Sequence, residues 1–105
     1  MHSITDKAEV SIDFPDKAYM GGFGRDSSYE AHADPDGVTI KLVRGGDERR
    51  EVIVHLHHFL FAGIVDDLAR SISAREPIDE AHRQPLREAA QRLAAALAVP
   101  SAADR

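Results

Sequence analysis

The fold is decided by the stretch from residue 27 to residue 57, which reads SSYEAHADPDGVTIKLVRGGDERREVIVHLH. Polar and apolar residues alternate on both sides of the tetrapeptide DPDG at 34–37, as they do in strands with one buried face. Proline in the second position and glycine in the last position of this tetrapeptide suit a tight turn. The glycine pair at 45–46 marks a second turn, so the stretch predicts three consecutive antiparallel strands.

Matching the apolar faces of these strands predicts their register, because a slip of one residue would turn a strand inside out. Pairing Ala33 with Val38 aligns the first two apolar faces and places Glu30 opposite Lys41 on the other face, a favourable cross-strand charge pair. Pairing the second strand with the third gives Leu42–Val52, Ile40–Val54 and Val38–Leu56 inside and Thr39–His55 outside.

The N-terminal part of the chain predicts further strands. Residues 10–14 alternate again and are ended by Pro15, which cannot donate a hydrogen bond to a sheet. Residues 18–23 read as an irregular strand because of their glycines. The expected sheet is therefore an antiparallel meander of four or five strands over residues 9–57.

After His58 the apolar period changes to that of a helix. One helix is predicted at 59–73 and another at 85–98, where Pro85 suits a helix start; residues 99–105 are expected to form a flexible tail. The predicted fold class is α+β, with both helices packed on one face of the sheet. The stripe on the second helix is rich in alanine, which also allows it to pack on a partner subunit. The apolar stripes consist of Phe61, Ile64, Val65, Leu68 and Ile72, and of Leu86, Ala90, Leu93 and Leu97.

Length and composition limit the classes of function. The 105 residues form one expected domain, without cysteine and with a net charge of −5, all of it within residues 1–36. Such a surface repels phosphate, so we expect no nucleic-acid partner. The longest apolar run, Phe59–Val65, is too short to span a bilayer, and the N-terminal residues lack the pattern of a signal peptide. We therefore expect a cytoplasmic protein without a membrane partner.

The histidines near the end of the last strand are the candidate metal ligands. His55 and His57 point to the same side of a strand, a spacing that lets two imidazoles converge on one ion. His32 lies one strand beyond Thr39 and is the candidate third ligand. No carboxylate follows at the spacing that metal sites of this kind use. Two alternative interpretations remain. The histidines either lie on the solvent-exposed face of the sheet without a ligand, or they form a pH-responsive interface. No cofactor is expected.

A glycine-rich stretch, MGGFGRDSS at 20–28, is the candidate site for an anion or small ligand. Glycines allow backbone N–H groups to point at an anion, which Arg25 and Ser27 could then help to bind. Gly22 and Gly24 have the spacing of a dinucleotide fingerprint, but a strand rather than a helix follows them. The alternative interpretation is a bend between two strands.

No arrangement of residues in the sequence indicates a catalytic site. The leading hypothesis is therefore a non-enzymatic interaction module whose partner is a second copy of the chain or another protein. The exposed sheet face predicted above, which mixes Val43 and Ile53 with polar side chains, motivates this hypothesis. The alternative is a protein that binds a metal or a small ligand through the histidines or the glycine-rich stretch.

Overall fold

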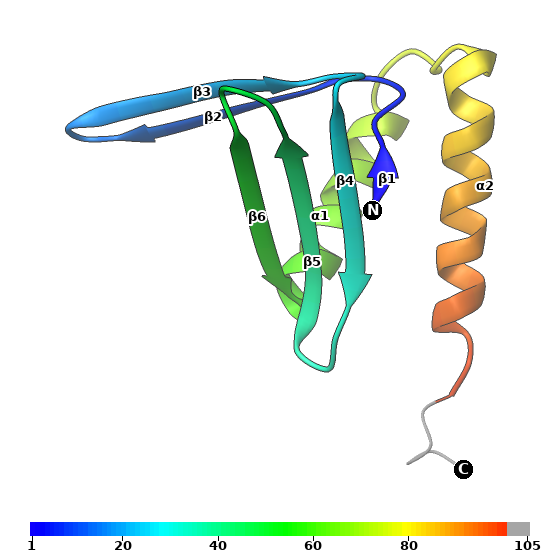
Figure 1. The fold of residues 1–105 in the computed structure, drawn as a ribbon. Coiled ribbons are helices and arrows are strands. Elements are labelled where there is room, and N and C mark those ends of the chain that lie inside the picture. The colour runs from blue at the N-terminus through cyan, green and yellow to red at the C-terminus, as the bar shows by residue number, and fades with distance from the viewer. Residues whose placement is uncertain (101–105) are drawn as a thin grey trace. The chain divides into compact units, whose positions relative to one another are not determined.

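A computed structural model describes residues 1–100 and shows an α+β fold of six strands followed by two helices (Figure 1). Residue contacts divide the chain into two units, Met1–Val65 and Asp66–Arg105, and each is described by itself. The expected flexible tail falls partly at 101–105, outside the described residues. The elements are β1 (His2–Ser3), β2 (Ala8–Phe14), β3 (Lys17–Phe23), β4 (Ser27–Ala33), β5 (Gly37–Arg44), β6 (Arg50–His57), α1 (His58–Ser73) and α2 (Glu80–Leu97).

The register predicted for the last three strands is confirmed. Strands β4, β5 and β6 form an antiparallel meander in which Ala33 pairs with Val38 and Leu42 with Val52. Thr39 lies opposite His55 on one side and His32 on the other. The short strand β1 joins the outer edge of β4, so the sheet has the order β1-β4-β5-β6. Within the described chain β6 pairs with β5 alone, so its second edge is open.

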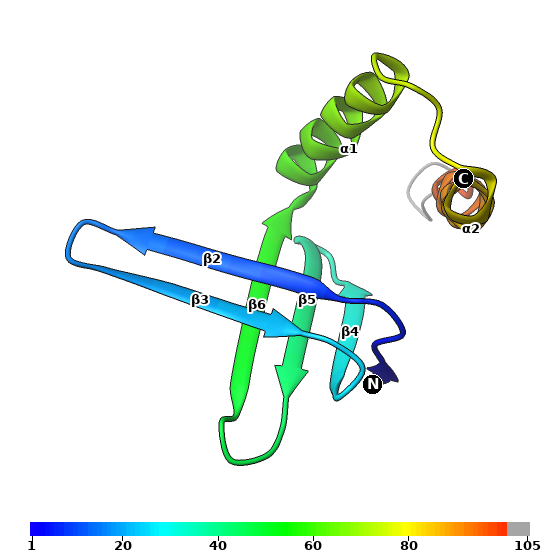
Figure 2. The ribbon, with the colours of Figure 1, turned by 90° about the horizontal axis from the view of Figure 1, so that it is seen from above.

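Strands β2 and β3 differ from the prediction, because they form a separate hairpin instead of extending the meander. Pairing is regular from Ala8–Phe23 to Phe14–Lys17, so β3 is not the irregular strand that its glycines suggested. Pro15 and Asp16 make the two-residue turn, and neither has a positive φ. The hairpin runs across the sheet and projects past the open edge of β6 (Figures 1 and 2).

Both helices exist, with one start that differs from the prediction. Helix α1 begins at the residue directly after β6, without a connecting loop. Helix α2 begins at Glu80, five residues before Pro85, because the side chain of Asp79 accepts a hydrogen bond from the backbone N–H of His82 and caps the helix. Pro85 therefore lies inside the helix, where it cannot donate to the carbonyl of Ala81.

The hydrophobic core of the described chain is small. Ile4 and Phe23 are the buried apolar residues, and they lie where β1 and the hairpin meet β4. Ile4 extends the β1–β4 pairing, since its N–H donates to the carbonyl of Ser27. Neither α1 nor α2 contains a buried residue. The α+β fold class is confirmed, and the packing of both helices on one face of the sheet stays a prediction.

Candidate functional site

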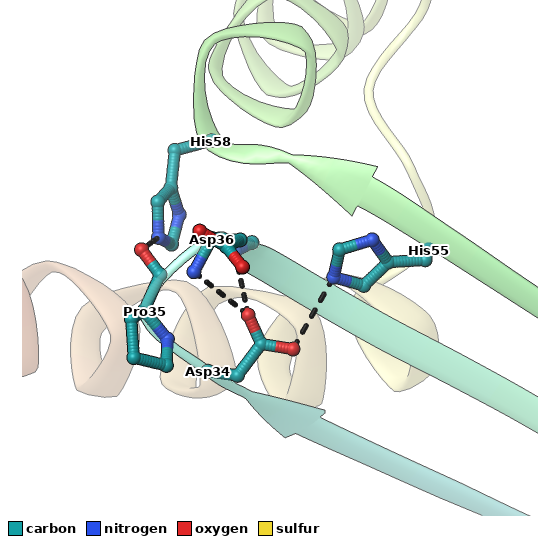
Figure 3. Close-up of polar contacts among 6 residues, drawn as sticks. Asp34, Pro35, Asp36, His55 and His58 are labelled. Carbon is teal, nitrogen blue, oxygen red and sulfur yellow. Dashed lines mark hydrogen bonds and ion pairs between the residues drawn. The ribbon is translucent and has the colours of Figure 1, made fainter.

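The turn between β4 and β5 is held by Asp34, as Figure 3 shows. One carboxylate oxygen, Oδ1, accepts from the N–H groups of Asp36 (2.8 Å) and Gly37 (2.9 Å). The backbone N–H of Asp34 donates to the carbonyl of Gly37 at 2.9 Å. This Asx turn is the reason why the DPDG sequence folds locally as predicted.

Two histidines bind the same turn to the end of β6 (Figure 3). Nε2 of His55 donates to Oδ2 of Asp34 at 3.2 Å, and Nε2 of His58 donates to the carbonyl of Pro35 at 3.2 Å. Because carboxylate and carbonyl oxygens only accept, Nε2 carries the proton in both rings. The N–H of His58 also donates to the carbonyl of Asp36. These contacts fix the point at which α1 leaves the sheet.

The charge of Asp34 is favoured by this environment. The N–H donors of Asp36 and Gly37, followed by the contact with His55, hold the pKa of the Asp34 carboxyl below its ordinary value of 3.8. Strands β5 and β6 also approach closely here: a Cβ on Gly37 would lie 2.1 Å from the carbonyl oxygen of Leu56. Glycine is therefore required at this position for a steric reason.

The structure brings two of the three candidate metal ligands together. The rings of His55 and His57 lie 5.0 Å apart, in an edge-to-face arrangement. The third candidate, His32, instead lies 3.8 Å from the carboxylate of Glu30 on its own strand. Among residues 1–100 no three side chains of the metal-ligating types gather closely enough to hold an ion. What the geometry shows is an Asp34–His55 hydrogen bond rather than a ligand set.

The glycine-rich candidate residues lie in a strand and in the turn that follows it. Gly22 is paired with Glu9 in the hairpin, and the N–H of Ser27 donates to the carbonyl of Gly24 to close the turn. The Ser27 hydroxyl donates to Asp26, whose other carboxylate oxygen lies 3.1 Å from Nε of Arg44. Arg25 is exposed at the turn. A carboxylate at the centre of this turn disfavours an anion, so the binding hypothesis gains no geometric support.

The apolar side chains that the core leaves uncovered form the main candidate interface. On the sheet, Ile53 is 58% exposed, Val54 42% and Ile40 38%. At the start of α1, Phe59 is 96% exposed, the highest value among the large hydrophobic residues. Contiguous exposed apolar groups of this size commonly mark a surface that another molecule covers.

A pocket of about 350 Å³ lies between the hairpin and the beginning of β6. The hairpin contributes an apolar wall that includes Ile12, Tyr19 and Met20, and β6 contributes Arg50, Glu51 and Val52. The pocket therefore opens beside the part of β6 whose outer edge is unpaired.

Sequence reasoning missed two features of this region. The sequence indicates Asp34 only as a turn residue, although the predicted register places it on the same face as His55, and this shared face is the signal for their contact. The projecting hairpin was missed because alternation predicts a strand but does not say which strand is its neighbour.

No protein-family model, curated protein or solved structure matches this chain. Neither helix of the described chain is long and apolar enough to cross a membrane. The function is therefore inferred from the exposed surfaces alone.

Proposed function

We propose that this protein is a non-enzymatic interaction module that acts as a homo-oligomer. The observation that carries the proposal is that few of the apolar residues are buried and many are exposed. Ile4 and Phe23 are buried, while Ile53 and Val54 of the sheet and Phe59 at the start of α1 are exposed. Fixing a chain in one conformation costs roughly 1–2 kcal/mol per residue, which burial of apolar surface must offset.

A second copy of the chain is a partner that can supply this burial. Burying a leucine, isoleucine, valine or phenylalanine side chain contributes about 1.5–3 kcal/mol. Ile40 and Val54 on the sheet and Phe59 and Leu68 on the helix are each more than one third exposed. Contacts that cover both regions would give the chain the core that it lacks by itself, as interfaces of obligate oligomers do.

Sedimentation velocity over a concentration series tests this proposal. We expect a species of at least twice the mass of the chain at micromolar concentration, and unfolding at a temperature that rises with protein concentration. A cooperatively folded monomer up to high micromolar concentration would contradict the proposal, because the exposed apolar side chains would then need no partner.

A further inference from the structure

We propose that two copies of this chain pair through the open edges of their β6 strands, around a two-fold axis at Val54. This inference rests on the proposed function, which requires self-association, and adds the surface and register that produce it. Joining two β6 strands would turn the two four-stranded sheets into one continuous sheet of eight.

The open edge of β6 has the properties of a pairing edge. It is eight residues long and carries neither proline nor lysine, which proteins commonly place on edge strands to prevent such pairing. Its middle residues, Val52, Ile53 and Val54, are apolar, and Ile53 is 58% exposed. An unpaired row of N–H and C=O groups here is a template for another strand.

Self-pairing of this strand has few acceptable registers. An antiparallel two-fold pair must be centred on a residue, because a centre between two residues would place the apolar face of one copy on the polar face of the other. When the two-fold axis passes through Val54, Val52 of each copy pairs with Leu56 of the other copy on the apolar face. Centring on Ile53 instead places Arg50 opposite Leu56, which is a poorer match.

Charge complementarity also favours Val54 as the centre. In that register Glu51 lies opposite His57 of the second copy, so the dimer gains two carboxylate–imidazole pairs. The side chain of His57 makes a ring contact with His55 in its own chain. The register centred on Ile53 would place Glu51 opposite His55, whose Nε2 already donates to Asp34.

The hairpin pocket lies where the second copy would arrive. The pocket is beside Arg50–Val52, and antiparallel pairing brings the end of the second β6, with the start of its α1, to this place. The hairpin projects over the same space past the β6 edge (Figure 2). Phe59, almost fully exposed at the start of α1, is the side chain best suited to enter the apolar pocket of the second copy.

Disulfide trapping tests the pairing and its register, since the natural chain contains no cysteine. In Val54→Cys the introduced cysteines of the two copies lie opposite each other at the two-fold axis, with Cα atoms about 4.5–5.5 Å apart. That separation allows a disulfide. We expect most of this variant to become a covalent dimer with oxidised glutathione, as judged by non-reducing electrophoresis.

Ile40→Cys is the matched control, because Ile40 pairs with Val54 inside the chain and has similar exposure. Its two copies would lie three strand spacings apart, about 14 Å, which is too far for a disulfide. If Val54→Cys does not fold by circular dichroism, the double variant Val52→Cys/Leu56→Cys replaces it. That variant should cross-link, whereas Val52→Cys alone should not.

The outcomes separate this inference from the proposed function. Equal cross-linking of Ile40→Cys and Val54→Cys would show face-to-face packing, and cross-linking of Ile53→Cys instead would show another register; either result overturns the pairing and leaves self-association standing. A wild-type monomer in sedimentation overturns both.

Phe59→Ala is the second test. Phe59 has little contact with its own chain, so this variant should keep the wild-type circular dichroism spectrum. We expect its dimer dissociation constant to rise at least tenfold, while Leu97→Ala, at the exposed end of α2, should leave that constant unchanged. An unchanged constant in Phe59→Ala would exclude the pocket as the docking place.

Discussion

The β4–β5–β6 meander and helix α1 have similar apolar content, but they differ in the contacts that hold them. The strands of the meander are bound to one another, whereas α1 is held mainly by hydrogen bonds within the helix. Each strand of the meander is hydrogen bonded to a neighbour, and one end is closed by Asp34 and two histidines. Helix α1 forms its own backbone hydrogen bonds but contains no fully buried residue. The contrast shows that a regular element can satisfy its own backbone hydrogen bonds while its apolar side chains remain without cover in the single chain.

The largest effect is expected at Gly37. The added methyl group in Gly37→Ala would collide with the Leu56 carbonyl, 2.1 Å away, and the strands must separate to admit it. We expect a loss of about 3 kcal/mol or more in the free energy of unfolding, measured by urea denaturation. Gly22→Ala is the control, because no atom lies within 4 Å of its Cβ position. Equal stability of the two variants would mean that the meander tolerates separation at this end.

A gain of stability is expected in α2. Pro85→Ala restores a backbone donor inside the helix and removes the clash of the ring with the preceding turn. Helix stability should rise by up to about 3 kcal/mol, seen as stronger circular dichroism at 222 nm. No increase would indicate that the first turn, capped by Asp79, is not helical in solution.

Self-association should be sensitive to the apolar stripe of α1. Leu68 is 55% exposed in the single chain, so Leu68→Asp costs little there, but it would place a charge in a covered interface. We expect the dimer to weaken at least tenfold, about 1.4 kcal/mol, in sedimentation experiments. Ala69→Asp adds the same charge off the stripe and should have a smaller effect. If both variants remain dimeric, the α1 face is not covered by the second copy.

The smallest effect concerns pH. The pKa of Asp34 is lowered in the folded state by the N–H donors of Asp36 and Gly37, so its contribution to stability is complete above pH 3.8 and is lost as the pH falls through the lowered value. Asp34→Asn keeps a side-chain oxygen for the turn but removes this ionisation. We expect wild type to lose more stability than Asp34→Asn between pH 5 and pH 2, as measured by thermal unfolding at each pH. Parallel curves would contradict this role of the carboxylate.

Much of the meander could be predicted because its pattern is local. Alternation and the DPDG turn gave the register through Ala33–Val38 and Leu42–Val52, residue by residue. The predicted start of α2 at residue 85 is wrong because Asp79 caps the helix and Pro85 lies inside it. His55 and His57 lie on the same side of β6, as their spacing predicts, but that spacing does not show that His55 contacts Asp34. That contact depends on how the turn folds back toward β6.

The sequence by itself determined the strands of the meander and of the hairpin, the presence of two helices, and which faces are apolar, since these follow from periodicity over a few residues. The tertiary structure alone decided that β2 and β3 form a separate hairpin and that β6 has an open edge. Strand neighbours and burial depend on contacts between distant residues, and an apolar face is equally compatible with a core inside the chain and with a partner outside it.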